Sequence, residues 1–434
     1  MEASTTSVVP GVTSEAKARS ITRLAAWVTG AALAAAALLL YAVTAAPTIT
    51  FTDSGELVTA AWTASIAHPP GYPLYTLLGW LWIHLPLGTD PAWRMNLLSA
   101  LFGAVAVGLF YGWVRDTFAA PPVTPAAATT PGRPRGRQVP PASAAATVSR
   151  APAQARRGAR GAQGAAPAPR KSPPAAASPA PTPNRPPAPG AAPEPAVPWA
   201  ATAGALAGAG LLAVSLTFWN WATQAKFYGL HYIFVVALFW LGWRAHRALR
   251  AETAGGDAPG TSWAPRTWSP ATRLLHAIVA VTGLALTNHF QTFLVLPGIA
   301  VLVVTGLRTL PAIRQRLLRY TPTLVPAGLV PLMLYLYLPI RAGMQPLFAW
   351  GQPTTLPAFW RQVTAQNYQH LFSSGNLGTH LVDAGVYAAN QFGPILSLLL
   401  LVPLAAGVRY LWGAHRSLLL ATGGTAVLSL LVDV

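Results

Sequence analysis

The first long apolar run of the chain is LAAWVTGAALAAAALLLYAV, residues Leu24–Val43. It contains no charged side chain, and it is as long as a helix must be, roughly 20 residues, to cross a hydrocarbon core of about 30 Å. Lys17, Arg19 and Arg23 precede it, which also suits a signal peptide. However, the apolar part of a signal peptide is usually only about 7–15 residues long. The length therefore favours a retained membrane helix.

Further apolar runs follow along the chain. The sequence is 53% hydrophobic and only 9% charged, far below the roughly 25% charge of soluble domains. These features predict an all-α polytopic membrane protein with about nine transmembrane helices. After the first span, the predicted spans are residues 93–114, 199–218, 230–243, 274–286, 290–306, 323–340, 387–408 and 417 to the end. The last run stops at Val434 without a polar flank, so we expect a truncated C-terminus.

Lysine and arginine are distributed unevenly between alternate loops. If the N-terminus is cytoplasmic, all but four of the 29 basic residues fall on inner segments. Because the cytoplasmic side of a membrane protein keeps the excess of basic residues, we predict a multi-pass plasma-membrane protein with a cytoplasmic tail over residues 1–23. The loops of residues 46–92 and 341–386 then lie on the outer face.

A Pro-, Ala- and Arg-rich tract, residues 119–198, separates the apolar parts 24–118 and 199–434. It lacks hydrophobic periodicity, so we predict a disordered cytoplasmic linker. Much of the net charge of +18 lies in this tract, which argues against a nucleic-acid partner. Its arginines could attract anionic membrane lipids at about 1 kcal/mol per basic residue. The simpler alternative is a solvated spacer without a partner.

The outer loop of residues 46–92 carries two further helical patterns. After Asp53, apolar residues recur at positions 57, 60, 61 and 64, and residues 74–85 form a very apolar run closed by Pro86. This spacing predicts two helices. Tryptophan and tyrosine side chains along them suit the headgroup layer, so we expect both helices to lie in the membrane interface.

Asp53 and Glu56 stand just beyond the first span. Asp-x-x-Glu before an apolar run is typical of a capping box, in which Asp53 accepts hydrogen bonds from first-turn amides. Alternatively, a carboxylate at the membrane boundary can accept a proton from an acceptor hydroxyl during group transfer. The sequence leaves both interpretations open. The two carboxylates could share a divalent ion, but no third ligand stands near them, so we predict no metal and no cofactor.

Three motifs in and after this loop carry a resemblance. They are Phe51-Thr52-Asp53-Ser54-Gly55-Glu56, His68-Pro69-Pro70-Gly71-Tyr72-Pro73-Leu74-Tyr75 and Trp93-Arg94-Met95-Asn96-Leu97-Leu98-Ser99-Ala100. The prolines and glycine of the second motif predict a sharp chain reversal after His68. The segment resembles the first outer loop of protein O-mannosyltransferases, which are membrane glycosyltransferases of the GT-C class. It is most similar to bacterial relatives of the metazoan transmembrane O-mannosyltransferase of plexin and receptor ectodomains.

The resemblance implies a GT-C fold that moves a sugar, mannose, from a polyprenyl-phosphate donor to a hydroxyl acceptor on the outer face, with inversion. The acceptor would be a protein serine or threonine or an envelope glycan. By the same resemblance, Asp53 is the general base and Glu56 a second acidic contact. Lys226 stands where the family pattern has an acidic residue. The predicted substrate-binding residues are His68, Tyr72, Arg94, Asn96, Lys226, Tyr228, His289 and Arg341.

Simpler roles exist for several of these residues. A cation at a span boundary is more often a headgroup anchor. His289 would also fit as a buried packing residue, and His68 as an incidental loop residue. For the whole protein, the alternative is a transporter or lipid flippase, although no acidic residue lies in the middle of an apolar run, where ion-coupled carriers place theirs. A nonenzymatic scaffold would leave the outer loop unexplained.

Overall fold

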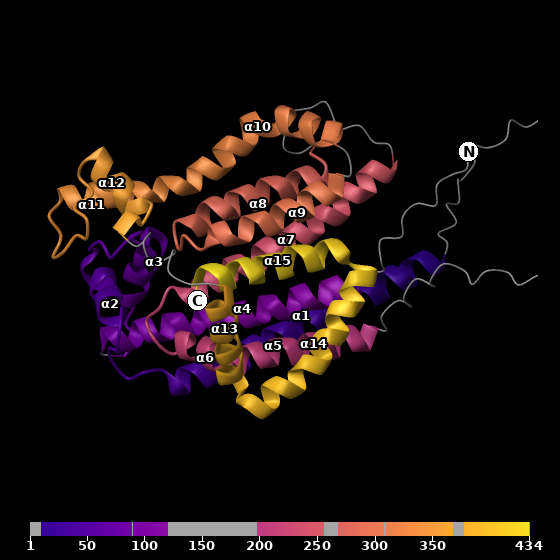
Figure 1. The fold of residues 1–434 in the computed structure, drawn as a ribbon, viewed down its shortest axis with the longest axis horizontal. Coiled ribbons are helices and arrows are strands. Elements are labelled where there is room, and N and C mark those ends of the chain that lie inside the picture. The colour runs from indigo at the N-terminus through magenta and orange to yellow at the C-terminus, as the bar shows by residue number, and fades with distance from the viewer. Residues whose placement is uncertain are drawn as a thin grey trace, which may run out of the picture. The chain divides into compact units, whose positions relative to one another are not determined.

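The computed structural model describes residues 10–88, 90–119, 198–255, 268–307, 310–367 and 377–433 (Figure 1). The chain divides into two units, residues 1–123 with 193–434, and residues 124–192. The second unit lies outside the described residues, and so does the predicted linker, apart from its two ends. The fold described below is that of the first unit.

The described secondary structure is helical, apart from one isolated bridge between Ile66 and Ala349. The longer helices are α1 (Pro10–Thr44), α4 (Pro91–Ala119), α5 (Pro198–Val214), α7 (Tyr228–Gly255), α8 (Pro270–Leu286), α9 (Thr292–Leu307), α10 (Leu310–Leu332), α13 (Leu377–Phe392), α14 (Pro394–Ala414) and α15 (Arg416–Asp433). The shorter ones are α2 (Ser54–Thr63), α3 (Pro73–Ile83), α6 (Leu216–Ala222), the 3-10 helix η2 (Met333–Leu336), α11 (Tyr337–Gly343) and α12 (Leu356–Val363). The all-α prediction is confirmed for the described part of the chain.

Within the described ranges, four helical segments are long and apolar enough to cross a membrane. They are Leu24–Thr44, Pro91–Ala119, Leu318–Gly343 and Pro394–Ala414, and α5 with α6 makes a fifth if this pair, bent by 66°, counts as one span. Each predicted span overlaps a helix. However, α8 and α9 have only 17 and 16 residues, fewer than the roughly 20 that a perpendicular span needs. The helices support a membrane protein, whereas nine spans remain a prediction.

Helix α4 packs against α1, α5 and α7, and small residues bring these helices close together. A Cβ atom at Gly108 of α4 would lie 3.0 Å from Ala34 Cβ and 3.2 Å from the Gly30 carbonyl oxygen, both on α1. Gly283 of α8 likewise lies against the carbonyl oxygen of Gly328 of α10. Close backbone approach of this kind is typical of membrane helices, because lipid tails are as apolar as leucine side chains and only tight packing favours association.

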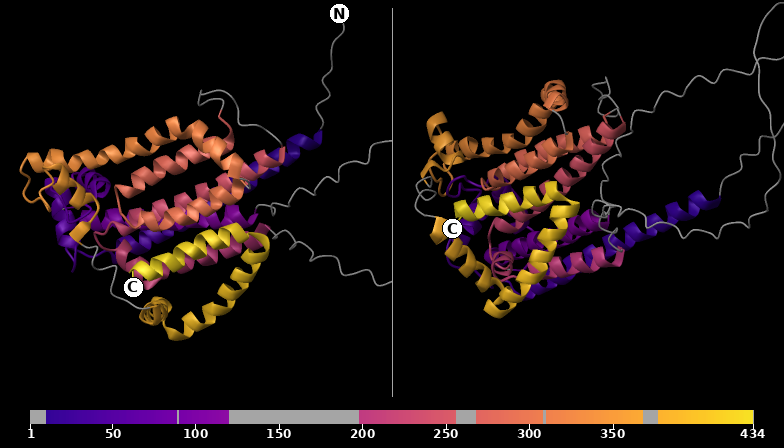
Figure 2. Two further views of the ribbon diagram at one scale, coloured as in Figure 1. Left: turned by 45° about the horizontal axis from the view of Figure 1, so that its top comes forward. Right: turned by 45° about the vertical axis from the view of Figure 1, so that its right-hand side comes forward.

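The described parts of two loops, residues 46–92 and 341–386, lie together at one end of the helices, which we call the site end. α2 and α3 are the two helices predicted there, and Leu57 and Tyr75 bury their faces in one apolar cluster with the start of α4. The second loop docks beside them, since the Ile66 N–H donates to the Phe348 carbonyl at 3.3 Å and the Trp350 N–H donates to the Ile66 carbonyl at 3.2 Å. Figure 1 and Figure 2 show α2, α3, α11 and α12 gathered at this end. The site is thus built on packed helices.

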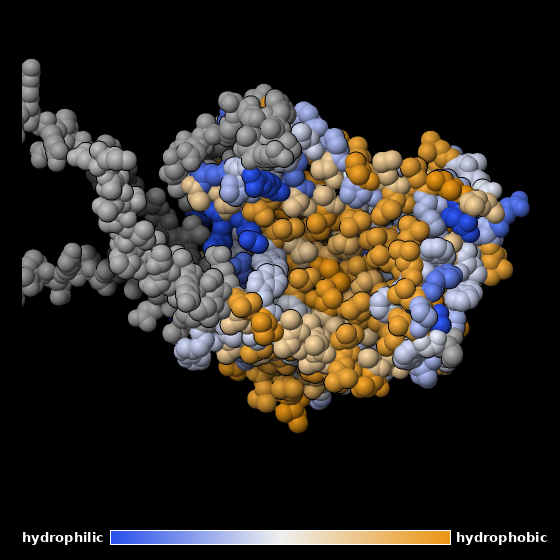
Figure 3. All heavy atoms as spheres, turned by 180° about the vertical axis from the view of Figure 1, so that it is seen from behind, coloured by the Kyte–Doolittle hydropathy of each residue, from blue (hydrophilic) through white to orange (hydrophobic). Residues whose placement is uncertain are grey.

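The surface of the described helices is divided by polarity. Figure 3 shows apolar side chains over the middle of one face and polar side chains toward both ends. α14 has no buried residue, and its Leu398 and Val402 are 66% and 73% exposed. An exposed apolar face of this extent is expected to contact lipid.

Candidate functional site

Asp53 is the N-cap residue of α2, yet its side chain makes no capping hydrogen bond. Its Oδ2 instead accepts a hydrogen bond from Lys226 Nζ at 2.8 Å. The capping-box interpretation is therefore wrong for this side chain, because the carboxylate pairs with a cation outside α2. The Asp53 side chain remains 38% exposed, so a ligand can reach it while Lys226 holds it.

Lys226 lies in the connection between α6 and α7, and it is buried. Its backbone N–H and C=O both bond with Ser99 Oγ of α4, at 3.2 and 3.3 Å, which fixes its main chain to the bundle. Its ammonium also donates to Thr52 Oγ1. A cation held in this way, at the edge of a region of low dielectric, can bind an anion strongly and with little rearrangement.

The ion pair lies in a pocket of about 690 Å³ at the site end. The wall is formed by the segment before α2, by α6 with its following connection, and by the start of α7. The lining residues are Thr50, Phe51, Thr52, Asp53, Asn220, Trp221, Gln224, Lys226 and Tyr228. Trp221 and Tyr228 stack with ring centroids 4.2 Å apart. Aromatic faces beside hydroxyl, amide and charged groups suit a sugar ligand.

The backbone beside Asp53 is strained. Thr52 has φ +67°, in the left-handed region that a β-branched residue rarely adopts. Strain of this kind costs about 1–3 kcal/mol and clusters at functional sites. Here it accompanies a conformation in which Thr52 Oγ1 and Asp53 Oδ2 both accept from Lys226. Packing of α2 against α3 and α4 holds this turn in place.

Glu56 faces the second outer motif. Its Oε1 accepts from the His68 backbone N–H at 2.6 Å, and its Oε2 lies 3.0 Å from His68 Nδ1. An ionised carboxylate can only accept, so a neutral imidazole here carries its hydrogen on Nδ1. Nε2, 2.9 Å from the Tyr72 hydroxyl, then accepts from that hydroxyl. The predicted chain reversal is confirmed, because the Gly71 N–H donates to the His68 carbonyl at 2.8 Å.

Tyr72 connects this chain of hydrogen bonds to a buried aromatic cluster. Its ring stacks on Phe227 with centroids 4.1 Å apart, and the His289 ring stacks on the same Phe227 at 4.7 Å. Burial lowers the pKa of His289 well below its ordinary value, and nearby His231 and His68 lower it further. His289 is therefore a neutral imidazole at pH 7. His289 contacts other aromatic rings, as a packing residue does. Its contact with the sugar donor stays a prediction.

Arg94 and Arg341, two of the predicted substrate-binding cations, bond to the main chain. The Arg94 guanidinium donates to three carbonyl oxygens in and after α3, at 2.6–2.7 Å. Arg341 donates to the carbonyls of Ala64 and Thr63 at the C-terminus of α2, at 2.8 and 3.2 Å. A cation at this position offsets the negative end of the helix dipole. Neither arginine lines the pocket.

Asn96 is buried on α4 and also bonds to the main chain. Its Nδ2 donates to the carbonyls of Ala46 and Thr48, at 2.7 and 3.0 Å. These two residues belong to the segment that leads from α1 to Asp53. Asn96 therefore positions the chain that carries the carboxylate, and it does not line the pocket.

The pocket contains residues that the sequence did not single out, Asn220 and Trp221 above all. Asn220 Oδ1 accepts from Gln224 Nε2, and the Thr50 hydroxyl contacts Gln224 Oε1 at 2.7 Å. The available signal was a pair of amide side chains four residues apart, Asn220 at the end of α6 and Gln224 just after it. Nothing in the sequence separates Trp221 from the other tryptophans. Across the described ranges, no three Asp, Glu or His side chains converge as metal ligands.

These features define a helical membrane protein with an ion-paired carboxylate in a polar, aromatic-lined pocket. The chain matches the family described as "Protein O-mannosyl-transferase TMEM260 N-terminal domain" over residues 53–127 and 192–310. The matched ranges contain every predicted site residue except Arg341. The match supports the O-mannosyltransferase-like part of the resemblance, and the predicted GT-C fold and bacterial subgroup remain expectations.

Two relatives share this similarity. A Mus musculus protein named "Protein O-mannosyl-transferase TMEM260" is 60% identical over 60 residues, which are 14% of this chain and 8% of the mouse protein. A Dictyostelium discoideum protein named "Protein O-mannosyl-transferase tmem260" is 37% identical over 75 residues, 17% of this chain and 9% of its own length. The aligned stretches span less than a tenth of either relative. No solved structure matches the chain.

Proposed function

We propose that the protein is a membrane glycosyltransferase that moves mannose from a polyprenyl-phosphate donor to a hydroxyl acceptor on the outer face. The observation that carries this proposal is the Lys226–Asp53 pair in an open pocket. It sets a carboxylate that can take a proton beside an ammonium that can bind a phosphate. The similarity to proteins named O-mannosyl-transferases supports the reaction class.

In the proposed reaction, the acceptor hydroxyl oxygen attacks the anomeric carbon of the sugar from the face opposite to the phosphate. The new carbon–oxygen bond forms as the bond between the anomeric carbon and the phosphate oxygen breaks, so the configuration inverts. Asp53 takes the hydroxyl proton. Polyprenyl phosphate leaves with the bonding electrons, and Lys226 stabilises the charge that develops on it.

The ion pair is compatible with both roles. The hydrogen bond described for Asp53 uses Oδ2, so Oδ1 can approach the acceptor hydroxyl while Lys226 holds the side chain in place. A phosphate bound in the pocket would draw part of the Lys226 charge from Asp53, because the ammonium has three donors. The ammonium can therefore contact the donor phosphate and Asp53 together.

Glu56 is the second acidic contact of the proposal. Its side chain is 22% exposed while both of its oxygens face His68. A carboxylate oxygen can accept more than one hydrogen bond, so Glu56 can also accept from a hydroxyl of the sugar or the acceptor. His68 is then a positioning residue, which holds Glu56 through its ring and its backbone N–H.

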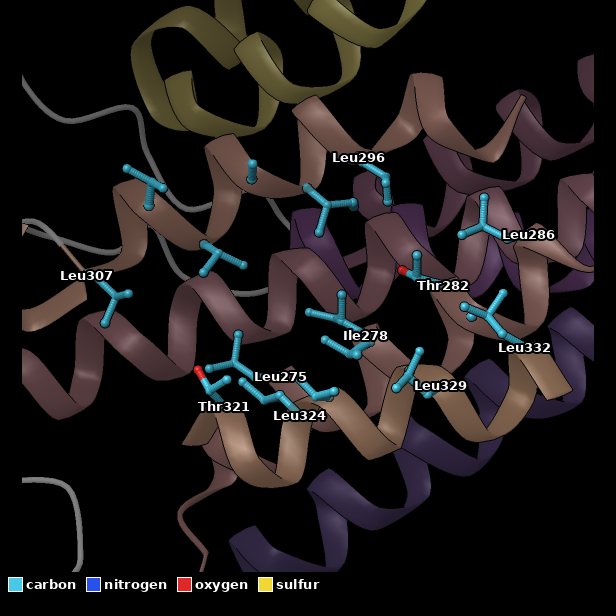
Figure 4. Close-up of a pocket in the computed structure, with 18 residues that line it drawn as sticks. Leu275, Ile278, Thr282, Leu286, Leu296, Leu307, Thr321, Leu324, Leu329 and Leu332 are labelled. Atoms are coloured by element: carbon cyan, nitrogen blue, oxygen red, sulfur yellow. The ribbon is translucent and has the colours of Figure 1, made fainter. Parts of the chain in front are cut away.

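An apolar groove suits the lipid part of the donor. α8, α9 and α10 enclose about 660 Å³, where the lining side chains are apolar except Thr282 and Thr321. Figure 4 shows side chains from these helices pointing into the space between them. The groove reaches Leu286 at the site end, three residues before His289. A polyprenyl chain has no hydrogen-bonding group, so burial in such a groove is favourable along its length.

The test is a transfer assay with the purified chain in liposomes. Radiolabelled polyprenyl-phosphate mannose and a serine- and threonine-containing peptide are supplied, and label on the peptide is measured. A water-soluble nucleotide mannose serves as the control donor. Transfer from the lipid-linked donor alone supports the proposal. Folded protein that transfers no sugar from any polyprenyl-phosphate donor, to peptide or envelope glycan, would overturn it.

A further inference from the structure

A second pocket of about 500 Å³ lies between α1, α4 and α7, at the end of the helices opposite to the site end. α4 starts at the site end, and Arg115 lies near its last turn. α7 starts at Tyr228 in the site pocket, and Arg244 lies about four turns further along. Both arginines are therefore at the far end of their helices. Its lining includes Trp27 and Ala31 of α1, Arg115 and Asp116 of α4, and Trp240 and Arg244 of α7. None of them belongs to the site described above.

The pocket has an apolar floor bounded by two tryptophans. Gly30, Ala34 and Gly108 let α1 and α4 approach closely, and their small side chains leave a shallow groove. Trp27 is 64% exposed, and its ring centroid lies 6.2 Å from that of Trp240. Tryptophan favours the boundary between headgroups and hydrocarbon. The groove is therefore placed to receive the first part of a lipid tail.

The rim of the pocket is charged, with a positive excess. Arg115 and Arg244 both line it, and Arg244 is exposed. One carboxylate, Asp116, stands beside them, and its Oδ2 accepts from Trp240 Nε1 at 2.9 Å. Two guanidinium groups and one carboxylate give a net positive rim. Guanidinium groups bind phosphate in a bidentate geometry, which makes arginine the preferred partner for this group.

We propose that this pocket binds one anionic glycerophospholipid of the adjacent leaflet. Arg115 and Arg244 bind the phosphate, the ring of Trp27 lies at the level of the glycerol, and one acyl chain lies along the floor near Gly30. Charge complementarity and the continuous apolar floor favour this occupant over a free phosphate ion, which could use the arginines but not the groove. The proposal is independent of the reaction, because the pocket lies at the other end of the helices.

Native mass spectrometry of the full chain tests this inference. The protein is released from nanodiscs that contain equal amounts of phosphatidylglycerol and phosphatidylcholine, and retained lipids are counted. The wild type is expected to keep one phosphatidylglycerol molecule. The double variant Arg115→Gln with Arg244→Gln should retain roughly a tenth or less of it, because both guanidinium groups that bind the phosphate are removed. Arg273→Gln, an exposed arginine at the same end on α8, is the matched control.

A second pair of variants separates the groove from the charges. Ala31 is exposed and lines the pocket, whereas Ala32 is exposed and does not. Ala31→Phe should lose the retained lipid although both arginines remain, and Ala32→Phe should keep it. Equal retention of both lipids by the wild type, or unchanged retention in the arginine double variant, would overturn the proposal and make these arginines headgroup anchors only. Inorganic phosphate that displaces the lipid at millimolar concentration would also contradict it.

Discussion

Lys226 determines what Asp53 can do. The side chains are far apart in the sequence, and the structure joins them at 2.8 Å. In the proposed reaction the same ammonium holds the base and stabilises the leaving phosphate. Lys226 is therefore expected to matter more than the cations at the other span boundaries, whose hydrogen bonds go to backbone carbonyls.

Substitution of Lys226 tests this role. Lys226→Gln should lower the rate of mannose transfer on the order of a hundredfold, the usual effect of removing one group that stabilises developing negative charge. The backbone contacts with Ser99 remain in this variant, so the protein should fold. Arg361→Gln, which removes an exposed cation of the other outer loop, is the control and should transfer at the wild-type rate. Equal rates for both variants would refute the assigned role.

For the candidate site, the sequence predicted individual residues but not that Asp53 pairs with Lys226. Asp53, Glu56 and His68 lie within one loop, so their proximity follows from local spacing. The contact between Asp53 and Lys226 depends on how α4 packs against α7, and no short-range pattern contains that information. For the same reason, the sequence alone did not show that Arg94, Asn96 and Arg341 donate to backbone carbonyls, and their substrate-binding role stays a prediction.

At the scale of elements, Arg341 joins α11 to the C-terminus of α2. Arg341→Gln should destabilise the protein by about 1–3 kcal/mol, because charge-assisted hydrogen bonds to two carbonyls are lost and those carbonyls remain partly buried. The expected result is a lower Tm with a nearly unchanged kcat in the folded fraction. Thermal unfolding in detergent and transfer kinetics measure the two effects. A large loss of kcat at unchanged Tm would instead support the substrate-binding prediction.

His289, in the turn between α8 and α9, should make the stability of the folded protein depend on pH. The pKa of His289 in the folded protein lies well below its ordinary value of about 6.5. Below about pH 6.5, His289 binds a proton in the unfolded chain but stays neutral in the folded chain. The free energy of unfolding therefore decreases as the pH falls. Acidification from pH 7.5 to 5.5 should therefore lower the Tm of the wild type more than that of His289→Gln. Parallel Tm curves would show that this histidine does not titrate as described.

The helices themselves were largely predictable. Hydrophobic periodicity located α1, α4, α2 and α3, because each has a long apolar run or a clear start signal. The number of spans was less predictable. Short helices such as α9 are apolar enough to cross a membrane but shorter than the roughly 20 residues that a span needs. The break between α5 and α6 at Ser215 was also missed, because no proline marks it.

At the level of the whole molecule, the predicted linker, residues 119–198, should be dispensable for mannose transfer. Its composition gives no reason to expect a packed core, and the site residues lie on both sides of it. Deletion of residues 125–195 should leave the transfer rate within about twofold of the wild type, because the entropy of closing a connection changes only slowly with its length. The comparison uses equal amounts of folded protein in liposomes. A folded but inactive deletion would show that the linker has a functional role.

In the proposed function, Asp53 is the base of a transfer reaction at the site end. The most direct measurement is the rate of mannose transfer by Asp53→Asn, compared with the wild type and with Asp383→Asn, which changes an exposed aspartate on α13. We predict a loss on the order of a thousandfold for Asp53→Asn, as expected when a general base is removed, with unchanged Tm and a wild-type rate for the control. Wild-type transfer by folded Asp53→Asn would show that Asp53 is not the base.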